Sequence, residues 1–142
     1  MKYRLNPSQK EPVMSAIGRY FEYGHPEVAF VYLFGSFAKE ESFADVDLGI
    51  GLFTEVGSAL EEELSYETKL ETVVQYPLDV RILNGAPNAF VYNVIKNGKL
   101  VVVRDPDYRA DFCGQVLKAY FDFAYFRRRY LKDVADARLK TF

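Results

Sequence analysis

Three aspartates in this sequence have the spacing of a site for a divalent cation. Asp45 and Asp47 lie at the start of one apolar run, and Asp79 opens a later one. Because side chains alternate along a strand, Asp45 and Asp47 should point to the same face of a sheet. Neighbouring carboxylates repel each other unless a cation joins them, and Mg²⁺ prefers oxygen ligands. If the two strands are neighbours, Asp79 joins the pair, so we expect a metal site at Asp45, Asp47 and Asp79.

A Gly-Ser pair precedes the aspartates along the chain. Gly35 and Ser36 end an apolar run, and eight residues separate Ser36 from Asp45. Glycine lets the backbone approach a phosphate closely, serine adds a hydroxyl, and a helix starting here would aim N–H groups at an anion. Lys39 lies one turn further on and is either a phosphate contact or a solvated lysine beside acidic residues. We therefore predict a phosphate-binding site at Gly35, Ser36 and Lys39.

The elements that must position these side chains follow from apolar spacing and turn residues. Ser8 and Glu11 have the form of a capping box for a first helix. On the third strand, Arg81 is expected to face away from Asp79, or else to pair with a phosphate or a carboxylate. We expect helices at about 9–23, 57–74 (with an imperfect apolar stripe), 87–97 and from 106 onward, and strands at about 28–34, 46–53, 78–83 and 100–103.

Strands interleaved with helices predict an α/β (α+β) fold, in which a mixed sheet is flanked by helices. The terminal helix is long, and its apolar spacing from Leu117 to Ala124 predicts that it packs across the domain. With 142 residues, 49% of them apolar, the chain can close a core by itself. We therefore expect a single domain, residues 1–142.

Composition narrows the classes of function. A formal net charge of −2 gives no overall attraction to nucleic acid, so direct binding of nucleic acid is not expected. No apolar run is long enough for a membrane span, and the polar start of the chain is unlike a signal peptide. Cys113 is the lone cysteine and His25 the lone histidine, which excludes a disulfide framework and a zinc site built from these residue types. We expect a cytoplasmic protein.

Taken together, these motifs resemble those of the polymerase-beta-like nucleotidyltransferase superfamily, whose pattern is Gly-Ser, a short spacer, Asp-x-Asp and a later strand aspartate. The closest resemblance is to its minimal branch, the small antitoxins (MNT) paired with HEPN toxins. The motif-bearing part covers about 28–84, and weaker similarity extends to the C-terminus. The segments that carry it are 31–39 and 78–84, followed by 104–112 and 120–123.

The resemblance implies an enzyme that transfers AMP from ATP to a tyrosine of a partner HEPN ribonuclease toxin and so neutralises it. Asp45 and Asp47 would hold Mg²⁺ on the triphosphate, and Asp79 would help to activate the attacking hydroxyl. Two features depart from the family pattern. The spacer between Ser36 and Asp45 is about two residues shorter, and Glu40 and Ala44 stand in place of glycine and serine.

Two other functions are compatible with the same residues. A non-catalytic antitoxin would mask its toxin by binding alone, with a shortened loop that no longer holds nucleotide. A nucleotidyltransferase acting on a small molecule would need an acceptor pocket, which a chain without a substantial second domain is poorly equipped to build.

Overall fold

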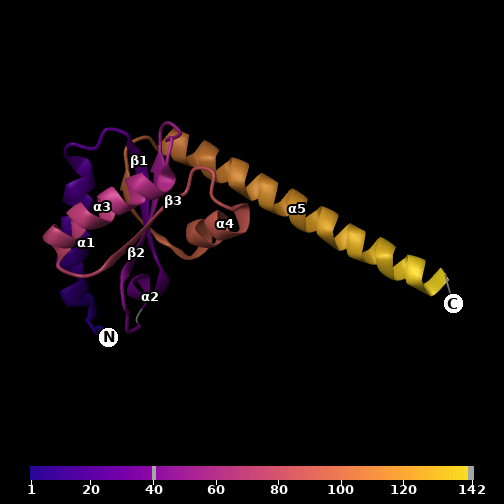
Figure 1. Ribbon diagram of the computed structural model, residues 1–142, viewed down its shortest axis with the longest axis horizontal. Coiled ribbons are helices and arrows are strands. Elements are labelled where there is room, and N and C mark those ends of the chain that lie inside the picture. The colour runs from indigo at the N-terminus through magenta and orange to yellow at the C-terminus, as the bar shows by residue number, and fades with distance from the viewer. Residues whose placement is uncertain (40, 141–142) are drawn as a thin grey trace.

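The computed structural model describes residues 1–39 and 41–140; Glu40, one of the departures from the family pattern, lies outside them. Strands alternate with helices through most of the chain (Figure 1). The elements are α1 (Pro7–Glu22), β1 (Val28–Phe34), α2 (Gly35–Ala38), β2 (Val46–Leu52), α3 (Ala59–Val74), β3 (Leu78–Ile82), α4 (Asn88–Asn97), β4 (Lys99–Val103) and α5 (Pro106–Lys140).

The strands form a mixed four-stranded sheet in the order β3-β2-β1-β4. β1 is antiparallel to both of its neighbours, β2 and β4. β2 and β3 are parallel, and α3 makes the crossover between them. A parallel pair needs such a crossover because the chain must return to the same end of the sheet before the second strand begins. This connection places Asp47 and Asp79 on neighbouring strands.

Each face of the sheet carries its own apolar cluster. Val31 and Leu33 of β1 face the side covered by α1 and α3, whereas Phe30 and Tyr32 face α4 and the start of α5. The near-continuous apolar run of β1 is therefore explained by burial on both faces. The structure confirms the predicted mixed sheet flanked by helices.

The cap of the first helix differs from the prediction. Asn6, not Ser8, is the N-cap: its side chain accepts a hydrogen bond from the Gln9 backbone N–H, and the Gln9 side chain accepts one from the Asn6 N–H. Pro7 then occupies the first helical position, where proline needs no backbone N–H. The Ser8 and Glu11 prediction was wrong because Asn-x-x-Gln satisfies the same geometry two residues earlier.

The terminal helix is long, as predicted, but it does not pack across the domain. Its first part, as far as Tyr120 and Phe121, contacts the rest of the fold: Cys113 and Val116 are buried, and Tyr120 stacks on Tyr92 of α4 with ring centroids 4.0 Å apart. The remainder projects away from the sheet (Figure 1). Large apolar side chains on the projecting part are exposed, among them Phe123, Phe126 and Tyr130. An apolar stripe on a helix predicts that something covers it, and periodicity alone does not say whether the cover belongs to the same chain.

Candidate active site

Two of the predicted site residues lie side by side because of strand register. In the parallel pairing of β2 with β3, Asp47 is the register partner of Asp79. The residues flanking each aspartate on its own strand point to the opposite face: Val46 and Leu48 on β2, Leu78 and Val80 on β3, all buried in the cluster under α1 and α3. Alternation therefore sends both carboxylates to the other face of the sheet.

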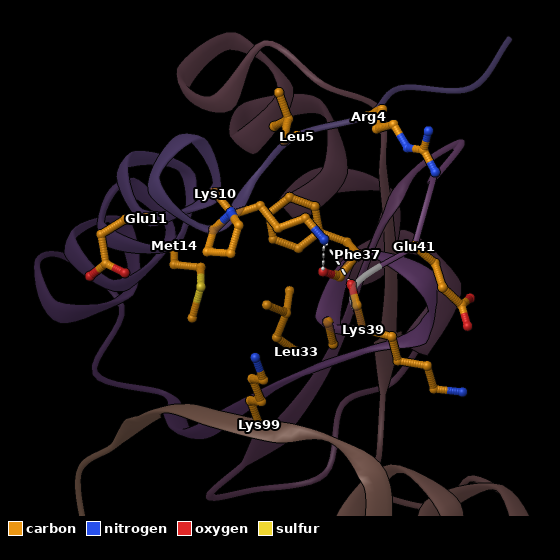
Figure 2. Close-up of a pocket in the computed structure, with 12 residues that line it drawn as sticks. Arg4, Leu5, Lys10, Glu11, Met14, Leu33, Phe37, Lys39, Glu41 and Lys99 are labelled. Carbon is orange, nitrogen blue, oxygen red and sulfur yellow. Dashed lines mark hydrogen bonds between the residues drawn. The ribbon is translucent and has the colours of Figure 1, made fainter.

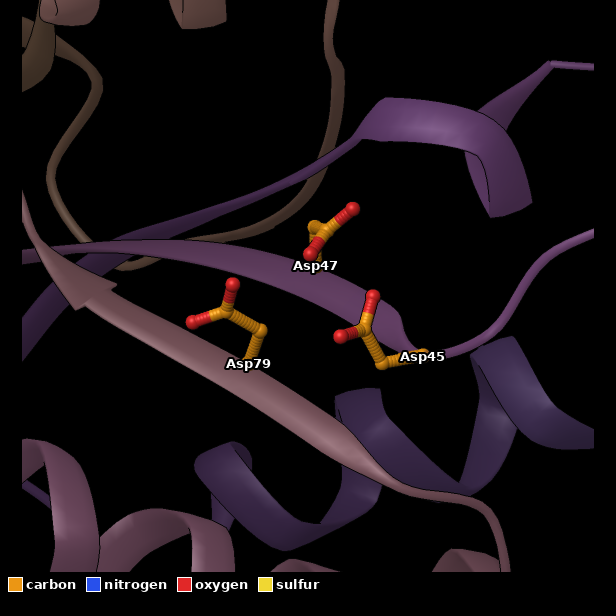
Figure 3. A group of neighbouring side chains, drawn as sticks. All are labelled: Asp45, Asp47 and Asp79. Atoms are coloured by element: carbon orange, nitrogen blue, oxygen red, sulfur yellow. The ribbon is translucent and has the colours of Figure 1, made fainter. Parts of the chain in front are cut away.

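Asp45 completes the group from the bend just before β2. The three carboxylates point toward one another (Figure 3), and an oxygen from each lies within 4.8 Å of the others. All three aspartates are half-buried. The convergence expected from the sequence is thus present in the fold.

The acidic surroundings change the proton affinity of Asp47. Burial, followed by the negative charges of Asp45 and Asp79, raises the pKa of Asp47 to about 7. Arg81 opposes this effect with its positive charge. A carboxyl group that keeps its proton near neutral pH beside two others is the behaviour expected when like charges share a site without a cation.

Arg81 lies where the sequence analysis did not expect it. Its guanidinium Nε donates a hydrogen bond to Asp79 Oδ1 at 3.1 Å, so the two side chains share one face of β3. The expectation that Arg81 faces away from Asp79 was wrong because residues two apart on a strand point the same way. The pairing with a carboxylate was the alternative, and the two-residue spacing was the signal for it.

The Gly-Ser pair starts the short helix α2, and its Gly35 lies beside Asp47. Gly35 has φ +73°, a conformation that L side chains rarely adopt, and a Cβ at this position would overlap Asp47 Oδ2. Glycine is therefore required here both by the backbone conformation and by the close approach of the carboxylate. Ser36 follows as a half-buried residue of α2.

Lys39 is placed differently from the other phosphate-binding candidates. It is exposed at the C-terminal end of α2 and lines a cavity of about 350 Å³ between α1 and α2. None of the three aspartates lines this cavity. The structure therefore brings Gly35 to the carboxylates and sets Lys39 on the opposite end of the four-residue helix.

The donor set of the acidic group fits a hard divalent cation. It offers carboxylate oxygens and, among the described residues, neither an imidazole nor a thiolate. Mg²⁺ binds through one or two carboxylates and takes its other oxygens from water and phosphate. The three carboxylates, each half-buried, can therefore supply the protein's share of the ligands to such an ion.

Acidic side chains on two parallel strands, beside a glycine turn on a mixed sheet, are the architecture of a nucleotidyltransferase domain. Residues 17–107 match the family model described as "Polymerase beta, Nucleotidyltransferase". Since this match covers more than half of the sequence, the chain belongs to the polymerase beta nucleotidyltransferase family. No curated protein is significantly similar to it in sequence.

Solved structures with the same fold come from toxin–antitoxin complexes. One is the complex of a tri-AMPylated Shewanella oneidensis HEPN toxin with an MNT antitoxin (TM-score 0.69, 18% identity, 88% of this chain and 98% of that chain). A second is a toxin–antitoxin complex with AMP-PNP (0.71, 18%, 85% and 97%). A third is the MntA–HepT toxin–antitoxin complex (0.68, 17%, 87% and 97%). At these identities the likeness establishes the fold.

Among the described residues no helix is long and apolar enough to cross a membrane.

Proposed function

We propose that this protein is an antitoxin that transfers AMP from ATP to a tyrosine of a partner HEPN-type ribonuclease toxin and thereby neutralises it. One observation carries the proposal: Asp47 and Asp79 are register partners on parallel strands, and Asp45 joins them within 4.8 Å. Membership of the nucleotidyltransferase family supports the reaction type. The AMPylated HEPN toxin in one of the similar complexes and the AMP-PNP in another support the acceptor and the nucleotide.

The proposed roles follow from position. Asp45 and Asp47 hold Mg²⁺ and, with it, the triphosphate of ATP. Gly35 lies against Asp47, and Ser36 follows it in α2. The two residues contact the phosphates through their backbone N–H groups and the serine hydroxyl. Lys39, at the other end of α2, is the weakest of the proposed phosphate contacts because its side chain lines a separate cavity.

The reaction is an in-line displacement at the α-phosphorus. The tyrosine oxygen forms a bond to this phosphorus while the bond to the β-phosphate oxygen breaks, and pyrophosphate leaves. Asp79 helps to activate the tyrosine hydroxyl, as a metal ligand or as the base that takes its proton. A divalent cation bound at the group supplies neutralisation of the developing negative charge.

A protein acceptor fits the surface of the chain better than a small molecule. The projecting part of α5 exposes several large aromatic side chains, and contiguous apolar surface of this kind marks sites of protein interaction. We propose that the whole chain, 1–142, acts as one domain in the cytoplasm, with the toxin bound to it in a hetero-oligomer.

The test is AMP transfer to a co-expressed HEPN partner, followed by mass spectrometry of the intact partner and of its tyrosine peptides. The wild type with ATP and Mg²⁺ should add AMP to a partner tyrosine. Asp45→Asn and Asp47→Asn keep the size of the side chain but remove ligand charge, so transfer should fall by at least about a hundredfold. Asp111→Asn, at an exposed position of α5, is the matched control and should behave as wild type.

Two outcomes would argue against the proposal. Wild-type transfer by both Asp variants would remove the acidic group from the reaction. Tight partner binding by a wild type that neither binds nor transfers nucleotide would show that the protein masks its toxin by contact alone.

A further inference from the structure

A buried lysine on α1 reaches the segment that joins the glycine turn to the aspartates. Only 9% of the Lys10 surface is exposed. Its Nζ donates hydrogen bonds to the carbonyl oxygens of Phe37 at 2.9 Å and of Lys39 at 2.7 Å (Figure 2). Burying an ammonium group is costly unless its donors are satisfied, and these carbonyls satisfy donors of Lys10.

The two carbonyls belong to the C-terminal end of α2. A helix leaves its last carbonyl groups without partners inside the helix, and a four-residue helix has few internal hydrogen bonds to hold it. The Lys10 ammonium therefore supplies an anchor that α2 lacks. The opposite end of the same helix begins at Gly35, which lies against Asp47.

The same ammonium also reaches the other end of the segment. Lys10 Nζ lies 5.0 Å from the ring centroid of Phe37 and 5.9 Å from that of Phe43. The two rings contact each other edge to face, with centroids 4.9 Å apart. Phe43 is held in addition by backbone hydrogen bonds to Tyr3, of 2.7 and 3.0 Å, and it comes two residues before Asp45.

We infer that Lys10 is a positioning residue of the active site: it holds the C-terminal end of α2 and the ring of Phe43, and so sets the glycine turn relative to the metal-binding carboxylates. It touches no reacting atom. The short spacer makes this role consequential, because a displacement of α2 at its C-terminal end is passed directly to Gly35. An apolar side chain at position 10 would fill the space without holding the carbonyls.

A direct test is hydrogen exchange of the backbone amides of residues 35–45 in the free protein. Lys10→Met keeps the length of the side chain and removes its donors, so these amides should exchange at least about tenfold faster, with those of α3 and β3 unchanged. Lys99→Met is the matched control: Lys99 lines the same cavity (Figure 2) and should leave the exchange unaltered. Unchanged exchange in Lys10→Met would overturn the inference. If Lys10→Met does not fold, Lys10→Gln, which keeps one donor group, should show a smaller acceleration confined to the same amides, and its absence counts equally against the inference.

The functional consequence rests on the proposed function and is measured separately. A purely structural role would lower the fraction of active protein and so reduce kcat alone. A positioning role weakens the binding of the triphosphate, so Lys10→Met should raise the KM for ATP about tenfold and change kcat by less than about threefold. A lower kcat at unchanged KM would contradict positioning. A wild type that transfers no AMP would defeat the proposed function, whereas the exchange measurement would still decide the role of Lys10.

Discussion

At the scale of single residues, the carboxyl group of Asp47 determines how the proposed binding of a cation depends on pH. Its carboxyl group is half-buried, faces the two other carboxylates, and has a pKa raised to about 7. Below that pH the group binds a proton in the metal-free protein. A cation entering the site must displace this proton, because a protonated carboxyl is a poor metal ligand.

The affinity for Mg²⁺ should therefore depend on pH with a definite sign. Below about pH 7 the apparent affinity should rise by up to about tenfold per pH unit, and above it the affinity should level off. Titration calorimetry in buffers of different ionisation enthalpy should detect about one proton released per Mg²⁺ at pH 6 and almost none at pH 8. Asp47→Asn should remove this dependence. An affinity that is constant from pH 6 to 8 in the wild type would show that Asp47 does not titrate there.

At the scale of elements, the edge strand β3 is held by a row of glutamates on α3. Glu67 Oε1 accepts a hydrogen bond from the Val80 N–H at 2.9 Å, and Glu63 Oε2 accepts one from the Ile82 N–H at 2.8 Å. Four helical residues rise about 6 Å and two strand residues about 6.6 Å, so the two repeats match. The outer N–H groups of the edge are thereby satisfied, and the strand that carries Asp79 is fixed from outside the sheet.

Glu67→Ala should lower the free energy of unfolding by about 1–2 kcal/mol, because it leaves the Val80 N–H without its acceptor. Glu67→Gln keeps a carbonyl oxygen at the same place and should lose less than half of that amount. Urea denaturation of the three proteins measures the difference. Equal stability of Glu67→Ala and wild type would mean that water replaces the carboxylate without cost.

These contacts also show what the sequence could predict and what it could not. The strands β1, β2 and β3 could be recognised in the sequence. A strand buried on both faces is a continuous apolar run, and a strand buried on one face alternates between apolar and polar residues. The sequence did not explain why the apolar stripe of α3 is imperfect. In the structure, glutamates of α3 accept hydrogen bonds from the backbone N–H groups at the outer edge of β3. Strand alternation predicted that Asp45 lies with Asp47, although in the structure Asp45 joins the group from the bend just before β2. The register that sets Asp47 beside Asp79 depends on pairing between distant segments, which no local pattern specifies.

At the scale of the whole molecule, the two parts of α5 differ in how far their apolar side chains are buried. Its first part is packed on the sheet and α4, with Val116 only 8% exposed, whereas Phe126 is 65% and Tyr130 67% exposed on the projecting part. The apolar spacing is similar in both parts. Sequence alone therefore could not separate the part that packs on this domain from the part that projects from it.

Substitutions along α5 should distinguish its two parts by their effect on the stability of the isolated protein. Phe126→Ser and Tyr130→Ser should change the free energy of unfolding of the isolated protein by less than about 0.5 kcal/mol, since neither side chain is buried. Val116→Ala should cost about 2 kcal/mol, because it removes methyl groups from a packed core. Thermal denaturation of each variant checks this. A large loss in Phe126→Ser would mean that the projecting part packs back onto the domain in solution.

The most direct test of the central claim compares ATP labelled at the α-phosphate with ATP labelled at the γ-phosphate, each supplied with Mg²⁺ to the protein and to the HEPN toxin proposed as its partner. Transfer of a nucleoside monophosphate predicts that α-label appears on the partner, that γ-label leaves as pyrophosphate, and that Asp47→Asn abolishes the α-signal. Label on the partner from the γ-position, or from neither position with the wild type, would contradict the account.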